Sequence, residues 1–225
     1  MSLYRRLGKR ALDLALAVPA LCVAMPVVTA AVVAVRATMG APAFFVQQRP
    51  GLGGRPFALI KLRTMRHATD QHGRLLDDAE RLTPLGRVLR GASIDELPQL
   101  LNVVAGDMSL VGPRPLLMQY LGRYSEQQAR RHEVKPGITG HAQVNGRNAL
   151  GWDDKFRLDV WYVDHVGFGI DLAILAQTAL KVVQRSGISA QGEATMREFM
   201  GTPSSATATT TATTTATTAT TTETA

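Results

Sequence analysis

The sequence predicts an α+β protein that is mostly helical, with a membrane helix at its N-terminus followed by a small β hairpin. Three observations support this class. Residues 11–35 form an apolar run with a single charge, Asp13, strand-like runs flank the turn-rich residues 50–56, and helix signals dominate from residue 83 to residue 185. The 45% hydrophobic content excludes a wholly disordered chain, and the single cysteine excludes a disulfide scaffold and a tetrahedral cysteine zinc site.

Composition divides the 225 residues into three parts. Residues 1–40 form a basic flank and the membrane helix, residues 41–201 form a folded domain, and residues 202–225 form a Thr/Ala-rich tail that we expect to be disordered. The formal net charge of +7 is compatible with nucleic acid, anionic lipid or phosphorylated substrates as partners. Composition does not choose among them.

The apolar run at residues 11–35 has three interpretations. A cleaved signal peptide is disfavoured because the run is long for the apolar part of such a peptide. A simple spanning helix is long enough, but it would carry the basic residues that follow it across the membrane, against the positive-inside bias. A helix that enters the membrane, bends at Pro26 and returns keeps both basic flanks on one side, and a proline in mid-helix favours a kink. The sequence therefore favours a re-entrant helix.

Local signals place the other elements in order. Residues 43–65 predict a hairpin, residues 66–81 a surface loop, and Thr83 a helix N-cap with Pro84 at the first helical position. Helices are expected at residues 84–90, 93–104, 116–132, 152–165 and 171–185, and irregular structure at residues 106–115 and 135–148.

The adjacent acids Asp95 and Glu96 form the most informative cluster. Ser93 and Glu96 fit the capping box S-x-x-E, and helix capping is the favoured interpretation of these residues taken alone. The alternative uses the same placement: a carboxylate at a helix start near Arg90 stays ionised and could attack phosphorus. The second acid could then hold Mg²⁺ or move a proton.

Two further arginines stand in rigid or Gly-rich segments. Pro113 and Pro115 stiffen the chain on both sides of Arg114, which is either an exposed arginine in a plain turn or a preorganised guanidinium for a phosphate. Arg147 follows the Gly-rich residues 136–146 and could complete a phosphate site, although this spacing is neither a Walker loop nor a dinucleotide fingerprint. The five histidines lack metal-ligand spacing.

Taken together, the chain resembles the bacterial sugar transferases that load phosphosugars onto polyprenol phosphate, the monotopic phosphoglycosyl transferases, and among them the small stand-alone members. The resemblance covers residues 9 to about 201, and its motifs are weak singly but specific as an ordered set. The matching motifs are Lys9-Arg10-x-x-Asp13, Gln48-Arg49-Pro50-Gly51, Lys61-x-Arg63-Thr64-Met65, Ser93-x-Asp95-Glu96-Leu97-x-Gln99-Leu100-x-Asn102-Val103, Gly106-Asp107-Met108-Ser109-x-Val111-Gly112-Pro113-Arg114-Pro115, Pro136-Gly137-Ile138-Thr139-Gly140 and Gln143-Val144-Asn145-Gly146-Arg147-Asn148.

This resemblance implies amphipathic interfacial helices around a compact cytoplasmic catalytic domain, held at the cytoplasmic face of the bacterial inner membrane by the re-entrant helix. It implies that Asp95 attacks the β-phosphorus of a UDP-sugar, releases UMP and passes the bound phosphosugar to polyprenol (undecaprenyl) phosphate in ping-pong order. Asp95 and Glu96 would hold Mg²⁺, with Glu96 as metal ligand or base. The implied phosphate- and substrate-binding residues are Arg90, Pro113, Arg114, Pro115 and Arg147.

The chain departs from the family pattern at Met25-Pro26, where small members commonly have Ser-Pro, so a hydroxyl that could bond a freed carbonyl is missing. An N-acetylated amino sugar is the donor expected from the members that look most similar, and nucleic acid is not an expected partner. Two other interpretations remain open: a membrane-anchored basic binding module without catalysis, and a bitopic scaffold with an exported domain.

Overall fold

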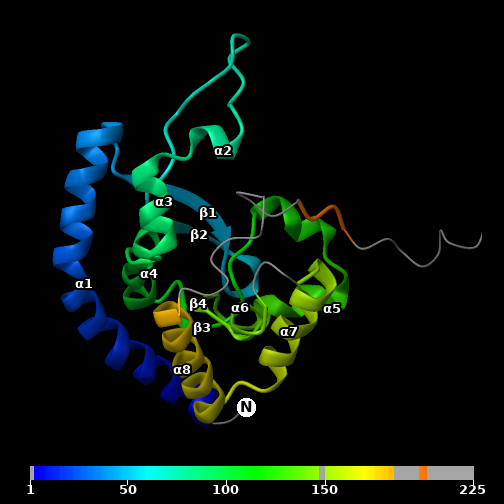
Figure 1. Cartoon of the computed structure of the whole chain (residues 1–225). Coiled ribbons are helices and arrows are strands. Elements are labelled where there is room, and N and C mark those ends of the chain that lie inside the picture. Colours follow the sequence, from blue (N-terminus) through cyan, green and yellow to red (C-terminus); the bar gives the residue numbers. More distant parts are fainter. Residues whose placement is uncertain (1–2, 147–149, 185–197, 202–225) are drawn as a thin grey trace, which may run out of the picture.

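The computed structural model describes residues 3–146, 150–184 and 198–201. They form a mostly helical domain with two small sheets, and the long helix α1 (Lys9–Met39) bows along one side of it (Figure 1). The predicted α+β class is therefore confirmed for these residues. The stretch Tyr4–Met39 is the one described helical segment that is long and apolar enough to cross a membrane. The tail at residues 202–225 lies outside the described residues.

The start of α1 is bonded to the domain. Arg10 donates from Nη1 and Nη2 to the carbonyls of Val103 and Val104, at 2.5 and 2.7 Å, near the C-terminus of α4 (Gln99–Ala105). A cation suits that position because the last carbonyls of a helix lack intrahelical donors. One turn further on, Asp13 is buried and turned toward the domain. The N-terminal half of α1 is therefore packed directly against the domain.

The end of α1 is bonded to the same domain. Arg63 donates to the carbonyls of Met39, Gly40 and Ala41, which end the helix. Gly40 has a φ of 71°, and glycine adopts this left-handed conformation without steric cost. Pro26 lies between these two anchored ends and cannot donate to the helix ladder.

The hairpin predicted at residues 43–65 is confirmed. β1 (Phe44–Pro50) pairs antiparallel with β2 (Pro56–Leu62) through a 3₁₀ turn at Leu52–Gly54. The following loop contains one short helix, α2 (Asp78–Arg81), that the sequence did not predict. The helix α3 (Pro84–Gly91) begins as expected, since the hydroxyl of Thr83 accepts from the Gly86 amide at 2.9 Å.

The single helix expected at residues 93–104 is wrong. A 3₁₀ turn at Ile94–Glu96 comes first, and α4 begins at Gln99. Ser93 has a φ of 55°, so its backbone reverses the chain after α3, and Pro98 supplies no amide for a continuous ladder. These two residues break the segment into a turn and a short helix.

The irregular structure expected at residues 106–115 and 135–148 is only partly correct. β3 (Ser109–Val111) pairs in parallel with β4 (Gly137–Thr139), and α6 (His141–Val144) follows. The backbone at Gly137 lies very close to the backbone at Gly112, since a Cβ added at Gly137 would be 2.1 Å from the Gly112 amide nitrogen. Partners so far apart in sequence leave no local signal, and this pairing brings the Pro-Arg-Pro segment beside the Gly-rich one.

The long helix expected at residues 116–132 is also wrong. It is replaced by 3₁₀ turns at Met118–Arg123 and Arg130–Glu133 on either side of α5 (Glu126–Ala129), which begins with a Ser125–Gln128 capping box. The last two helices are confirmed with shifted ends, as α7 (Trp152–Asp164) and α8 (Phe168–Gln184). The main core joins α1, α4, β3, α7 and α8 through Ala17, Val103, Met108, Val111, Tyr162, Val163 and Ile174.

Candidate active site

The acids Asp95 and Glu96 lie in the 3₁₀ turn between α3 and α4. The side chain of Ser93 makes no capping hydrogen bond, so the favoured capping interpretation of Ser93 and Glu96 is wrong. The left-handed backbone of Ser93 removes its side chain from the place that an N-cap needs. The carboxylate of Glu96 is thereby available for partners from other elements.

Glu96 is held by two cations on one oxygen. Lys61 Nζ of β2 lies 2.9 Å, and Arg114 Nη2 of the loop after β3 lies 2.7 Å, from Glu96 Oε1. Burial alone would disfavour the ionised carboxylate, but Arg114 and Lys61 outweigh it and hold the pKa of Glu96 well below its usual range. Glu96 is therefore an ionised, fixed carboxylate at neutral pH.

The pKa of Asp95 is shifted in the opposite direction to that of Glu96. Asp95 is 8% exposed, and no described residue donates a hydrogen bond to its carboxylate. Burial, and then the negative charge of Glu96, raise the pKa of Asp95 to about 6, while Lys61, Arg90 and Arg114 act in the other direction. Two neighbouring acids thus differ in role: one is fixed and ionised, and the other titrates near neutral pH with unused lone pairs.

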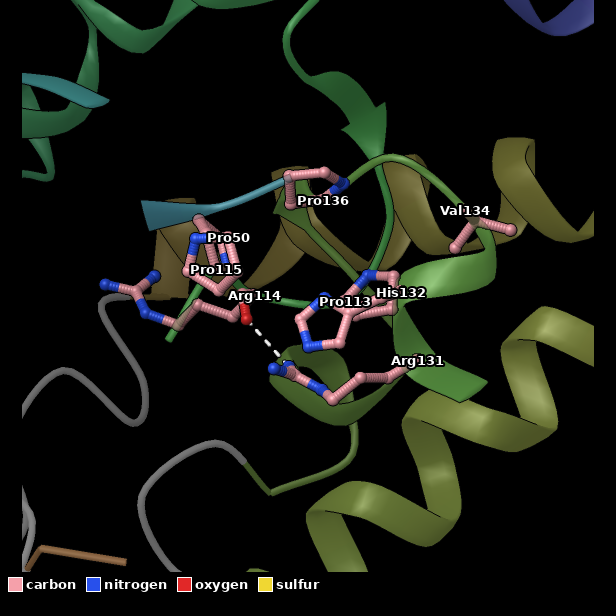
Figure 2. Close-up of a pocket in the computed structure, with 8 residues that line it drawn as sticks. All are labelled: Pro50, Pro113, Arg114, Pro115, Arg131, His132, Val134 and Pro136. Atoms are coloured by element: carbon pink, nitrogen blue, oxygen red, sulfur yellow. Dashed lines mark hydrogen bonds between the residues drawn. The ribbon is translucent and has the colours of Figure 1, made fainter. Parts of the chain in front are cut away.

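Arg90 and Arg114 both lie near the acids, as the sequence predicted. Arg90 Nε of α3 donates to Thr64 Oγ1 at 3.0 Å, which orients its guanidinium, and its charge lowers the pKa of Asp95. Pro113 and Pro115 line a small pocket together with the backbone of Arg114, whose guanidinium points away from that pocket (Figure 2). Arg147 lies outside the described residues.

These distances place two carboxylates among three cations, beside a long apolar helix. A family model described as bacterial sugar transferase matches residues 4–185 of the chain. The chain belongs to the bacterial sugar transferase family. The prediction of that family is therefore confirmed.

Individual relatives span a range of lengths. An uncharacterized sugar transferase of Bacillus subtilis, EpsL, is 55% identical over 194 residues, which cover 86% of this chain and 96% of the relative. A UDP-glucose:undecaprenyl-phosphate glucose-1-phosphate transferase of Xanthomonas campestris is 39% identical, over 80% of this chain but only 40% of its own length. A UDP-N-acetylgalactosamine-undecaprenyl-phosphate N-acetylgalactosaminephosphotransferase of Aeromonas hydrophila is 35% identical, over 80% of this chain and 44% of its own length.

The donor set of this family member fits Mg²⁺ better than a metal that demands a full protein cage. The described residues contain no group of three or more His, Cys, Asp or Glu side chains that could surround a metal ion. Mg²⁺, however, is usually bound by one or two carboxylates together with substrate phosphates and water. Asp95 and the second carboxylate oxygen of Glu96, which accepts no hydrogen bond from a described residue, would suffice for that mode.

The site contains a residue whose role the sequence reasoning missed. Lys61 appeared only within a motif, yet its ammonium is one of the two groups that hold Glu96. Burial, followed by repulsion from Arg114, lowers its pKa. The sequence did contain a signal for this role. Alternate residues of a strand point to the same face, so Lys61 lies on the same face of β2 as the buried Phe57 and Leu59. A lysine on the apolar face of a strand indicates a buried acidic partner.

Proposed function

We propose that this sugar transferase moves a sugar 1-phosphate from a UDP-sugar to undecaprenyl phosphate and releases UMP. The observation that carries the proposal is the state of Asp95: a buried carboxylate to which no described residue donates a hydrogen bond, next to a fixed carboxylate and three cations. A nucleophile needs unused lone pairs, and a diphosphate needs positive charge around it. The activities for which two relatives are named support the same reaction.

The reaction proceeds in two displacements. An oxygen of Asp95 attacks the β-phosphorus of the donor, the bond from that phosphorus to the bridging oxygen breaks, and UMP leaves with the electron pair. The aspartyl-phosphosugar is then attacked at the same phosphorus by a phosphate oxygen of undecaprenyl phosphate. This second step restores the Asp95 carboxylate and yields a lipid-linked diphosphosugar, so atoms and charge balance over both steps.

Glu96 acts electrostatically in this scheme. Its depressed pKa makes it a poor proton acceptor, so of its two expected roles we favour metal ligand over base. Mg²⁺ held by Asp95 and Glu96 would neutralise part of the diphosphate charge when bound. Arg90 and Arg114 supply positive charge from α3 and from the Pro-Arg-Pro segment, with Pro113 and Pro115 limiting the motion of Arg114. We assign Arg147 to the same phosphate-binding group.

We further propose that α1 is re-entrant and that the domain lies on the cytoplasmic face of the bacterial inner membrane. A helix of 31 residues is about 46 Å long when straight, longer than a bilayer core of about 30 Å. Yet Arg10 at the start of α1 donates to the domain, and Arg63 of the same domain donates to the carbonyls at the end of α1. If α1 crossed the bilayer, the domain would have to follow it through the lipid with buried ion pairs, which is costly.

The outer surface supports insertion into lipid. Large apolar side chains are exposed on the part of α1 that faces away from the domain, at Val23, Val27 and Val33, and on β1 at Phe45 and Val46. A soluble surface rarely gathers so many large apolar residues on neighbouring elements. These side chains are suited to a membrane, whereas the anchored face of α1 carries Arg10 and Asp13.

For the donor we propose a UDP-linked N-acetylated amino sugar. One relative is named for N-acetylgalactosamine, while others are named for glucose or galactose, so the sugar is decided by the experiment below. The non-catalytic alternative, a basic binding module, provides no reason for a fixed Glu96 beside an Asp95 that accepts no hydrogen bond from the described residues.

The deciding experiment is UMP release by the detergent-solubilised protein with Mg²⁺, undecaprenyl phosphate and a panel of UDP-sugars. We expect release with one acetamido sugar, loss of release when Mg²⁺ is chelated, and loss in Asp95→Asn. A phosphosugar trapped on the protein before the lipid is added, and absent in Asp95→Asn, would support the covalent step. Full turnover by Asp95→Asn would contradict the mechanism, and binding without any UMP release would favour the binding module.

A further inference from the structure

The segment Gly112–Pro115 is held by hydrogen bonds to parts of the fold that are distant in sequence. Its two prolines have no amide hydrogen, so the segment cannot build a turn from its own donors. Instead the Gly137 amide donates to the Pro113 carbonyl at 3.0 Å, and the Gly112 amide donates to the Thr139 carbonyl at 2.8 Å. The backbone of Arg114 therefore takes its position from the parts of the domain that surround it.

The carbonyl of Arg114 has a buried side chain as its donor. Arg131 Nη2 lies 2.7 Å from that oxygen, and Figure 2 shows this bond beneath the proline-lined pocket. Arg131 belongs to the 3₁₀ turn before β4, and its side chain is 2% exposed. A buried guanidinium aimed at one backbone carbonyl fixes that peptide unit from a distant element.

Arg131 is itself held in place. Its Nη2 and Nε lie 2.7 and 3.1 Å from Asp159 Oδ2 of α7, and its guanidinium packs over the rings of Tyr124 and Phe156. One guanidinium thus bonds Asp159 and the Arg114 carbonyl at the same time. A lysine could keep the ion pair, but its ammonium lacks the planar fork that serves both acceptors.

We propose that Arg131, oriented by Asp159, is a positioning residue that sets the place of the Arg114 guanidinium against Glu96. The inference rests on the proposed function, in which Asp95 is the nucleophile. The path is short: Asp159 fixes Arg131, Arg131 fixes the backbone of Arg114, and the Arg114 guanidinium lies 2.7 Å from Glu96. Coulombic attraction falls with distance, so a displaced Arg114 weakens the positive field at both acids.

The effect should be specific to one cation of the site. Of Lys61, Arg90 and Arg114, only Arg114 has a described hydrogen bond to Arg131. Disturbing Arg131 should therefore displace the Arg114 guanidinium and leave Lys61 and Arg90 in place.

The test compares Arg131→Lys with Arg130→Lys in the full chain. Arg130 is the adjacent residue and pairs with Asp164 of α7, but that pair is exposed and far less buried than Arg131–Asp159. The activity-independent measurement is the ¹⁵N NMR signal of the Arg114 guanidinium, assigned with Arg114→Ala. We expect Arg131→Lys to shift or broaden this signal and to lower the kcat for UMP release by about 10- to 100-fold. Arg130→Lys should change neither.

A double-mutant cycle separates positioning from general stability. In an Arg114→Ala background, Arg131→Lys should cause no further change of kcat, because its effect passes through Arg114. If Arg131→Lys lowers only the melting temperature and leaves the Arg114 signal and the kcat unchanged, the role is structural and the proposal is overturned. Asp159→Asn is the second variant should Arg131→Lys not fold, with the same expected change of the Arg114 signal. If the wild type releases no UMP with any donor, the proposed function fails, while the Arg114 signal still decides the positioning role.

Discussion

Lys61 and Arg114 meet on the same oxygen of Glu96, one from a strand and the other from a loop more than fifty residues away. This convergence leaves the other oxygen of Glu96 for a ligand and fixes the negative charge beside Asp95. The pKa values of the two acids are therefore shifted in opposite directions, and the first two predictions depend on this difference.

Asp95→Asn and Glu96→Gln should change stability in opposite directions at pH 7. The pKa of Asp95 is raised to about 6, so its favourable contribution is present below pH 3.8 and lost as pH rises through about 6. Asp95→Asn should therefore increase the free energy of unfolding by about 3 kcal/mol well above pH 6, and by little below pH 4. Urea unfolding in detergent across this pH range measures the difference. Equal stability of Asp95→Asn and wild type at pH 7.5 would contradict the assigned burial cost.

Glu96→Gln should destabilise the protein at pH 7. The pKa of Glu96 is lowered, so its contribution is present above pH 4.5 and lost as pH falls below that value. Removing the charge leaves the partly exposed Lys61 and Arg114 without their anion, at a cost of about 2 kcal/mol. The same unfolding series should show this difference shrinking toward low pH. Glu133→Gln, in an exposed pair with Arg130, is the control and should change stability by less than about 1 kcal/mol.

The rate of UMP release should rise with pH through about 6. Asp95 must be ionised to attack phosphorus, and its pKa lies near that value. The measurement is kcat/KM for the donor from pH 5 to 8 at constant ionic strength. A rate that is already constant from pH 5 upward would show that the group limiting the reaction is not this carboxyl.

Asp13→Ala should loosen α1 from the domain. Asp13 is buried and accepts from Ser109 Oγ and the Leu110 amide, both at 2.9 Å. Its removal leaves a buried amide unbonded, with an expected loss of about 2 kcal/mol of unfolding free energy. Ser109→Ala, which removes one of the two bonds, should lose about half as much. A stability equal to wild type in Asp13→Ala would mean that the anchor lies elsewhere.

Pro26→Ala should straighten α1 toward a spanning helix. The substitution restores an amide donor in the helix interior and removes the ring that disfavours a straight ladder. The test places a reporter cysteine in the domain after replacing the native Cys22 by serine and labels it from each side of the membrane. Pro19→Ala is the matched control. Unchanged labelling in Pro26→Ala would mean that Arg10 and Arg63, rather than the proline, determine the path of α1.

Local chemistry was sufficient for much of the fold. The apolar run, the hairpin between residues 43 and 65, the Thr83 cap of α3 and the two last helices could be predicted, because each depends on periodicity, turn residues or a cap within a few residues. The acid pair and Arg114 could be named as site residues because the ordered motifs resemble a family.

What the sequence by itself determined was therefore the long apolar helix, the hairpin, the start of α3, the last two helices, and which acids and arginines are available. The tertiary structure alone decided their relations. The parallel pairing of β3 with β4, the turn that replaces a helix at Ser93 and the bond from Arg131 to Arg114 join residues that local patterns cannot connect. The same holds for the electrostatics. Burial raises the pKa of Asp95, while Arg114 and Lys61 lower that of Glu96, because folding removes water and brings those two cations to only one of two neighbouring carboxylates.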